Sequence, residues 1–334
     1  MSRVVAKPLE ILCGRSGVSL PFQMERIQAG RNSEVWRLFS VDGQWILKNY
    51  FQDDSDGRDR LGTEYRFLTF LSNGGIRRVA KPLGIDRAAH RAIYSFLIGR
   101  RPTAITSSHI TEAVAFIADI NERRNESEAL ALPKASEACF SVQDHLDLIE
   151  ARLSRWMKTR PQAGVHADAH VFMKEKVCPC WGRIRDRLQQ GSTQLATPLS
   201  PEARVISPSD FGFHNTLDAD GTLSFLDFEY AGWDDPAKLI CDFICEPELP
   251  VSDSQGRQFK VELLRNLPSP DAIERRVDDL LPVHRVKWIS ILLNEFRAAD
   301  RLRRIHAGVE SDGLLADQLN KAKHYFNLHL ALLN

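Results

Sequence analysis

The chain has 334 residues, enough for one large or two ordinary domains, each with its own core. Lysine plus arginine and aspartate plus glutamate both number 44, so no net charge favours a nucleic acid or an anionic membrane surface, and a small-molecule partner is expected. The N-terminus lacks a secretory signal pattern, no segment approaches roughly 18 uninterrupted apolar residues, and the six cysteines are scattered, so we predict a cytoplasmic protein with reduced thiols and no membrane insertion.

The first hundred residues show the pattern of a β-sheet with one helix. Asp42-Gly43 is a typical two-residue hairpin turn between two segments rich in β-branched and aromatic residues. Residues 58–75 have helical spacing of apolar side chains and end at Gly74. The expected strands are 22–28, 33–41, 43–51, 79–85 and 90–99.

The rest of the chain is mainly helical in pattern. We therefore predict an α+β fold with a small β-rich N-terminal lobe at 1–98 and a larger helical C-terminal lobe at 99–334. The expected helices are 110–124, 142–158, 181–190, 284–305 and 315–333. Loops are expected at 125–140, 160–178 and 192–204, and a flexible flap at 246–258.

A hairpin interrupts the helical part of the chain. The dipeptide Asp220-Gly221 is a strong hairpin signal. Counting back from this turn places Asn215 opposite Leu226, so Asn215 and Asp227 are expected at the same open end of the hairpin.

Asp210 lies in the loop that leads into this hairpin. The Asn215 amide and the Asp227 carboxylate are oxygen ligands of the kind that Mg²⁺ prefers, and a free carboxylate beside them suits a site for metal, water and phosphate. The alternative is that Asp210 and Asn215 only cap a turn.

This segment resembles the catalytic segment of the aminoglycoside phosphotransferase and choline kinase-like families, which are relatives of the protein kinases. Residues 210–212 also spell Asp-Phe-Gly, the metal-binding motif of protein kinases. That interpretation needs an Asp-x₄-Asn roughly twenty residues upstream, and 186–206 contains none. The matching residues are Asp210, Asn215, Asp227-Phe228-Glu229 and Gly232-Trp233-Asp234-Asp235-Pro236.

The resemblance implies a bilobal protein kinase-like fold and an ATP-dependent kinase that phosphorylates a hydroxyl group of a small metabolite. Under it, Asp210 accepts or orients the proton of the attacking hydroxyl, while Asn215 and Asp227 hold Mg²⁺. Pro208 stands where these families usually have histidine, which leaves a nucleotide-binding pseudokinase with a regulatory or scaffold role as the alternative.

The resemblance extends to the N-terminal lobe. Lys48 matches the lysine that contacts the ATP phosphates, Glu64 matches its helical partner, and Asn32 and Ser33 fall in the loop that covers the nucleotide. Considered alone, Lys48 has an ordinary alternative, an amphipathic side chain that extends to solvent from a strand.

The residues after Asp227 are candidates for substrate contact. Carboxylates beside aromatic faces suit an ammonium group, so an amino alcohol is slightly favoured over a sugar or an aminoglycoside as acceptor. The alternatives are that the aromatic rings pack internally and that the glutamate pairs with a nearby arginine. These candidates are Glu229, Tyr230, Trp233 and Asp234.

A second cluster contains zinc-ligand residue types. His166 and His170 are four residues apart, and Cys178 and Cys180 follow. The Cys-x-Cys spacing differs from the usual Cys-x₂-Cys knuckle, so we expect a loop with two reduced thiols in preference to a metal site.

Overall fold

The structure is a computed structural model that describes residues 6–27, 33–52, 57–159, 163–191, 193–297 and 313–333. These residues form two compact units. The first contains the described residues of Met1–Ser136 and Pro208–Gly232, and the second those of Glu137–Ser207, Trp233–Leu302 and Glu310–Asn334. Each unit is built from separate stretches of the chain, so this division does not locate the segment that joins the two predicted lobes. The predicted lobe boundary after residue 98 therefore stays a prediction.

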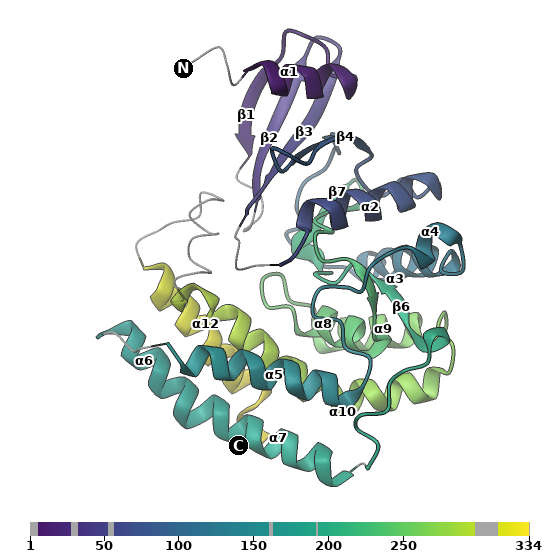
Figure 1. The fold of residues 1–334 in the computed structure, drawn as a ribbon. Coiled ribbons are helices and arrows are strands. Elements are labelled where there is room, and N and C mark those ends of the chain that lie inside the picture. The colour runs from purple at the N-terminus through teal and green to yellow at the C-terminus, as the bar shows by residue number, and fades with distance from the viewer. Residues whose placement is uncertain are drawn as a thin grey trace. The chain divides into compact units, whose positions relative to one another are not determined.

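The first unit is built on a five-stranded antiparallel sheet, drawn in purple and blue in Figure 1. The strand order is β1-β2-β3-β5-β4, so β3 is the central strand. Each predicted strand is present with slightly different ends. The strands are β1 (Gln23–Ile27), β2 (Ser33–Ser40), β3 (Gly43–Tyr50), β4 (Pro82–Asp86) and β5 (Arg91–Ser95).

Consecutive side chains of β3 point to opposite faces of the sheet and contact different helices. Leu47 belongs to a buried cluster with Leu12 of α1 (Ala6–Arg15), a helix that the sequence analysis did not predict. Lys48 points to the opposite face, toward Glu64 of α2 (Arg60–Asn73). The predicted helical stop at Gly74 is confirmed as the C-cap of α2. The unit also contains α3 (Ser107–Glu122) and α4 (Ser127–Leu130).

The second unit is mainly helical. Its short strands β6 (Val205–Ser207) and β9 (Gly232–Asp234) pair with each other. None of the described helices is long and apolar enough to cross a membrane. The helices are α5 (Val142–Met157), α6 (Val165–Phe172), α7 (Cys178–Gly191), α8 (Pro236–Cys245), α9 (Asp253–Leu264), α10 (Pro270–Leu292) and α12 (Leu314–His329).

Two of the predicted irregular segments are wrong, and a third, at 125–140, contains the short helix α4. The expected loop at 160–178 is helical from Val165 onward, because α6 continues through a π-helical turn into α7 and buries apolar residues such as Phe172 and Val177. The expected flap at 246–258 becomes helical at Asp253. Its N-cap signal is a capping box, in which the Ser252 side chain and the side chain at the third helical position satisfy each other's backbone N–H groups.

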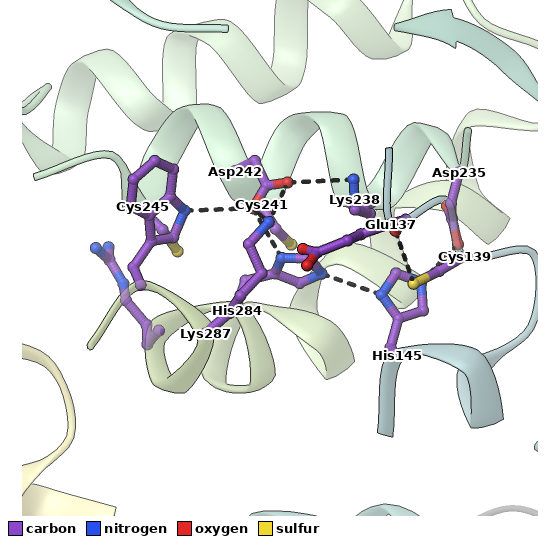
Figure 2. Close-up of polar contacts among 12 residues, drawn as sticks. Glu137, Cys139, His145, Asp235, Lys238, Cys241, Asp242, Cys245, His284 and Lys287 are labelled. Atoms are coloured by element: carbon purple, nitrogen blue, oxygen red, sulfur yellow. Dashed lines mark hydrogen bonds and ion pairs between the residues drawn. The ribbon is translucent and has the colours of Figure 1, made fainter. Parts of the chain in front are cut away.

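A buried polar network joins α5, α8 and α10 in the second unit (Figure 2). His145 Nε2 lies 3.1 Å from Asp235 Oδ2, and His145 Nδ1 lies 3.1 Å from His284 Nε2. The chain of contacts continues to Asp242, whose Oδ1 lies 2.9 Å from His284 Nδ1. Asp235 also caps α8, because its Oδ1 accepts the N–H of Ala237 at 2.7 Å. The network therefore fixes the start of α8 against two other helices.

Charged side chains surround the two imidazoles. Lys287 Nζ lies 2.6 Å from Asp242 Oδ2, Lys238 Nζ lies 3.5 Å from the same atom, and Arg276 Nε lies 2.6 Å from Asp235 Oδ2. Burial lowers the pKa of His284 to about 4, although Asp242 opposes this shift. The His284 ring is therefore neutral at pH 7.

His284 gives the fold a predicted acid sensitivity. Its folded pKa of about 4 lies below the unfolded value of about 6.5, so between these values the unfolded chain binds the additional proton. Its contribution to stability is full above pH 6.5 and is lost as the pH falls toward 4. His284→Gln should flatten this fall by up to about one proton per molecule, measured from the free energy of unfolding in urea at several pH values.

Burial also lowers the pKa of His329 to about 4, so the comparison is made between the wild-type protein and His284→Gln, both of which keep His329. A His284→Gln protein with the wild-type pH dependence would contradict the assignment.

Candidate functional site

Lys48 lies on the central strand of the first unit and faces three carboxylates. Its Nζ lies 2.7 Å from Glu64 Oε2, 2.7 Å from Asp227 Oδ1 and 3.3 Å from Glu229 Oε1. Burial disfavours the charged amine, but the three carboxylates outweigh it and raise the pKa of Lys48 well above its usual value. Only 10% of the Lys48 side chain is exposed, so it does not extend to solvent as an ordinary strand lysine would.

Glu64 accepts hydrogen bonds from three donors. Besides Lys48, they are the hydroxyl of Tyr50 at 2.6 Å and the backbone N–H of Phe228 at 3.2 Å. The Tyr50 hydroxyl lies 2.7 Å from the hydroxyl of Tyr94 on β5. The structure thus brings together the predicted Lys48–Glu64 pair and ties it to the segment that follows Asp227.

The hairpin has the predicted register. β7 (Thr216–Ala219) pairs with β8 (Thr222–Phe225), and Ala219 faces Thr222 across the turn. The N–H of Leu226 donates to the carbonyl of Asn215 at 2.9 Å, so these residues are opposite each other as expected. The open end of the hairpin therefore carries Asn215 beside Asp227.

The backbone is strained next to the predicted catalytic residue Asp210 and at the predicted metal ligand Asp227. Ser209, which precedes Asp210, has a φ of 71°, and Asp227 itself has a φ of 64°. A left-handed conformation costs a residue with a side chain on the order of 1–3 kcal/mol and persists only where the surroundings impose it. Such strain is found preferentially at functional sites.

Asp210 lies in the loop before the hairpin and is accessible. Its side chain is 32% exposed, and His214 Nε2 lies 3.4 Å from its Oδ1. The side-chain N–H of Asn215 donates to the backbone carbonyl of Asp210 at 3.1 Å. In the described part of the chain, Asn215 Oδ1 accepts no hydrogen bond and can serve as a cation ligand.

Two phenylalanines anchor these carboxylates. Phe211 follows Asp210 and Phe228 follows Asp227, and both are buried. Their ring centroids lie 6.0 and 6.2 Å from that of Phe116 on α3. A shared aromatic layer therefore holds the two acidic residues, because each is one residue away from a packed ring.

The Glu229 carboxylate is paired with cationic side chains of the protein itself. Its Oε2 lies 3.2 Å from Arg60 Nε, and Ser33 Oγ donates to its Oε1 at 3.3 Å. Burial raises the pKa of Glu229 to about 8, and the carboxylates of Asp227 and Glu64 add to the shift, while Lys48 opposes it. The pairing with an arginine, left open as an alternative, is found here. The role of Glu229 in substrate contact stays a prediction.

The remaining predicted site residues have different surroundings. Tyr230 lies against the guanidinium groups of Arg58 and Arg60, at 5.6 and 5.8 Å from its ring centroid. Asp234 belongs to the second unit, where its Oδ2 lies 2.6 Å from Lys238 Nζ and its side chain has no exposed surface. The internal packing of Tyr230 is the alternative expected from the sequence, whereas no ion pair was predicted for Asp234. Trp233 also lies in the second unit, and Asn32 lies outside the described residues.

Lys48 and the three carboxylates around it form a group of side chains, the Lys48 cluster, that contains possible ligands for a metal ion. Within the described ranges, Glu64, Asp227 and Glu229 form the one group of at least three acidic, histidine or cysteine side chains whose ligand atoms all lie within 4.8 Å of one another. Asn215 adds an amide oxygen on the same hairpin end. The Asp227 carboxylate and the Asn215 amide fit Mg²⁺, provided that Lys48 releases Asp227, whereas Lys48 and Tyr50 hold Glu64, and Arg60 pairs with Glu229.

The second cluster has internal packing partners instead. The ring of His166 meets Phe296 edge-on at 5.2 Å, and His170 stacks on Trp156 at 5.9 Å. Burial raises the pKa values of Cys178 and Cys180, which disfavours the thiolate that zinc would bind.

Solved structures share this fold. No protein-family model and no curated protein sequence matches the chain. A choline/ethanolamine kinase family protein from Mesorhizobium loti matches with a TM-score of 0.54 at 15% identity, covering 96% of this chain and 99% of that one. Choline kinase from Streptococcus pneumoniae matches with a TM-score of 0.55 at 13% identity, covering 97% and 100%. Spectinomycin phosphotransferase, solved with ADP and spectinomycin, matches with a TM-score of 0.61 at 12% identity, covering 96% and 99%.

The predicted α+β kinase-like fold is confirmed. The match spans nearly the whole length of this chain and of each of these proteins, so the N-terminal sheet and the helical remainder both belong to it.

The structure adds site residues that the sequence analysis missed. Arg60, Tyr50 and Tyr94 contact the carboxylates around Lys48 directly or through one hydroxyl. Tyr50 had a signal, because it lies two residues after Lys48 on one strand and so points to the same face. His214 also had one, since it lies four residues after Asp210 and directly before Asn215.

Glu229→Gln should fold with nearly the stability of the wild type at pH 7. A carboxyl group with a pKa of about 8 is already mainly protonated, and the amide resembles that neutral form. Thermal unfolding is the measurement, and we expect a change in Tm of no more than about 3 °C.

Glu64→Gln is the matched comparison. The carboxylate now accepts hydrogen bonds from Lys48 and Tyr50, and the amide nitrogen of glutamine cannot accept them. We expect a clearly larger fall in Tm for this variant. Equal falls in the two variants would show that Glu229 is ionised and as strongly paired as Glu64.

Proposed function

We propose that the protein is a small-molecule kinase that transfers the γ-phosphoryl group of ATP, with Mg²⁺, to a hydroxyl group. The observation that carries the proposal is the convergence of Lys48, Glu64 and Asp227 in one cluster, with Asn215 at the same hairpin end. Their order along the chain and their placement on a strand, a helix and a hairpin follow the pattern of phosphoryl-transfer sites.

Lys48 and Glu64 act together in nucleotide binding. Lys48 is fully charged at neutral pH and is held by Glu64, so it can turn toward phosphate oxygens without losing that partner. Asp227 and Asn215 are the residues that would hold Mg²⁺, and Ser33, which was predicted in the loop over the nucleotide but is the first residue of β2, would lie at the end of that loop. When bound, the ion neutralises phosphate charge.

Asp210 is the proposed acceptor of the hydroxyl proton. Its carboxylate is exposed enough to meet a substrate, and its loop is anchored by Phe211 and by the Asn215 amide. Its carboxylate is not among those that contact Lys48, so its proposed contribution is to orient and deprotonate the attacking oxygen.

For the acceptor we propose an amino alcohol first, with sugars and aminoglycosides as the next classes. The structural neighbours named as choline and ethanolamine kinases and as a spectinomycin phosphotransferase support these acceptor classes, and the order rests on the carboxylates and aromatic rings that follow Asp227. Glu229 supports it less, because the protein's own cations already face its carboxylate.

The direct test is release of ADP from Mg·ATP in the presence of each acceptor class, with the phosphorylated product identified by mass spectrometry. We expect turnover with at least one hydroxyl compound, and none without the divalent ion. Hydrolysis of ATP to phosphate with no phosphorylated acceptor across the panel would contradict the proposed transfer.

Asp210→Asn should lower kcat by at least about 100-fold while the Kd for Mg·ATP changes little, since the lost group serves the acceptor hydroxyl. Asp220→Asn is a matched control on the same hairpin: Asp220 is exposed and has a φ of 54°, which asparagine tolerates. Near-normal kcat in Asp210→Asn would sink the assignment.

The pseudokinase alternative rests on Pro208, which stands where the resembled families usually have histidine. A regulatory protein of this kind would bind Mg·ATP and phosphorylate no acceptor. The same assays distinguish the two functions, because nucleotide binding without product from the whole panel favours the alternative.

A further inference from the structure

Two buried tyrosines meet beside the Lys48 cluster. Tyr50 ends β3 and Tyr94 lies on β5, the neighbouring strand, and both are less than 5% exposed. Their hydroxyl oxygens lie 2.7 Å apart, and the Tyr50 oxygen lies 2.6 Å from Glu64 Oε2. The proposed reaction assigns no role to either hydroxyl.

The direction of both hydrogen bonds follows from proton counting. An ionised carboxylate can only accept, so the single hydroxyl proton of Tyr50 is donated to Glu64. The Tyr50 oxygen therefore has only lone pairs for the second bond, and Tyr94 must be its donor. The pair forms a one-way chain from Tyr94 through Tyr50 to Glu64.

Both hydroxyl groups keep their protons. Burial raises the pKa values of Tyr50 and Tyr94 well above their usual range, and the charge of Glu64 adds to both shifts. Glu64 therefore has a permanent neutral donor in addition to Lys48.

This donor matters because Glu64 connects two parts of the site. Its Oε2 accepts hydrogen bonds from Lys48 Nζ and from the Tyr50 hydroxyl. Its Oε1 accepts a hydrogen bond from the backbone N–H of Phe228, the residue after Asp227. Without the Tyr50 hydroxyl, the carboxylate would be positioned on the Oε2 side by Lys48 alone. Lys48 is shared with Asp227 and is the group proposed to turn toward the nucleotide phosphates, so Lys48 alone would fix the carboxylate less firmly.

We propose that Tyr50, supported by Tyr94, is a positioning residue that fixes the Glu64 carboxylate so that Lys48 and the Asp227 segment are set for nucleotide binding. The inference rests on the proposed function, because it assumes that Lys48 meets phosphate. It differs from a packing role, because the ring of Tyr50 would pack equally well without its hydroxyl.

The first test compares nucleotide affinity in tyrosine-to-phenylalanine variants by calorimetric titration of Mg·ADP. Tyr50→Phe should raise the Kd by about 10-fold, the order of one hydrogen bond to a charged group. Tyr94→Phe removes only the outer donor and should raise the Kd less, which keeps the inference testable if Tyr50→Phe folds poorly. Tyr65→Phe is the control, because the Tyr65 hydroxyl on α2 makes no hydrogen bond within the described residues.

A double-mutant cycle separates positioning from general structural loss. If Tyr50 acts through Glu64, the effect of Tyr50→Phe on Kd should largely disappear in a Glu64→Gln background. Independent, additive effects of the two substitutions on Kd would overturn the inference, as would a wild-type Kd in both Tyr50→Phe and Tyr94→Phe.

Titration of the wild-type protein with Mg·ADP distinguishes failure of the proposed function from failure of the positioning role. Absence of Mg·ADP binding to the wild-type protein would contradict the proposed function itself. Binding by the wild type with an unchanged Kd in the two tyrosine variants would contradict only the positioning role.

Discussion

The buried ammonium group of Lys48 is the charge on which the site depends. Glu64, Asp227 and Glu229 lie within 3.3 Å of it, and these three carboxylates, two buried and one half-buried, would repel one another without a cation among them. Arg60 supplies a second positive charge to Glu229, and one proton on Glu229 relieves the remaining excess. A strand, a helix and the end of a hairpin are thereby held together by electrostatics as well as by packing.

The same arrangement separates the tasks of the carboxylates. Glu64 has two donors besides Lys48 and can stay in place when Lys48 turns toward a phosphate. Asp227 has a strained backbone and shares Lys48, so it is the carboxylate that a divalent cation can take over. Aromatic packing through Phe211 and Phe228 holds both acidic segments during this exchange. Under the proposed function, a divalent cation held by Asp227 would supply electrostatic neutralisation in a preorganised site, as phosphoryl transfer requires.

Local signals predicted the parts of the site that depend on neighbouring residues. The hairpin register followed from Asp220-Gly221, and the helix that carries Glu64 from its apolar spacing and Gly74. The partners of Glu229 could not be found in this way, because Arg60 and Ser33 reach it only after the chain has folded back. The Tyr50–Tyr94 contact likewise requires β3 and β5 to be neighbours in the sheet, which no local pattern specifies. The wrongly predicted loop at 160–178 has a similar cause, since packing keeps that segment helical despite its Cys-Pro-Cys sequence.

A crystal structure with Mn²⁺ and a non-hydrolysable ATP analogue tests the central claim most directly, since the anomalous scattering of the ion fixes its position. The predicted result is an ion bound by Asp227 and Asn215, with Lys48 moved from Asp227 onto a phosphate oxygen and still paired with Glu64. An ion or analogue bound elsewhere, or Lys48 still paired with Asp227 while the analogue is bound, would contradict the account.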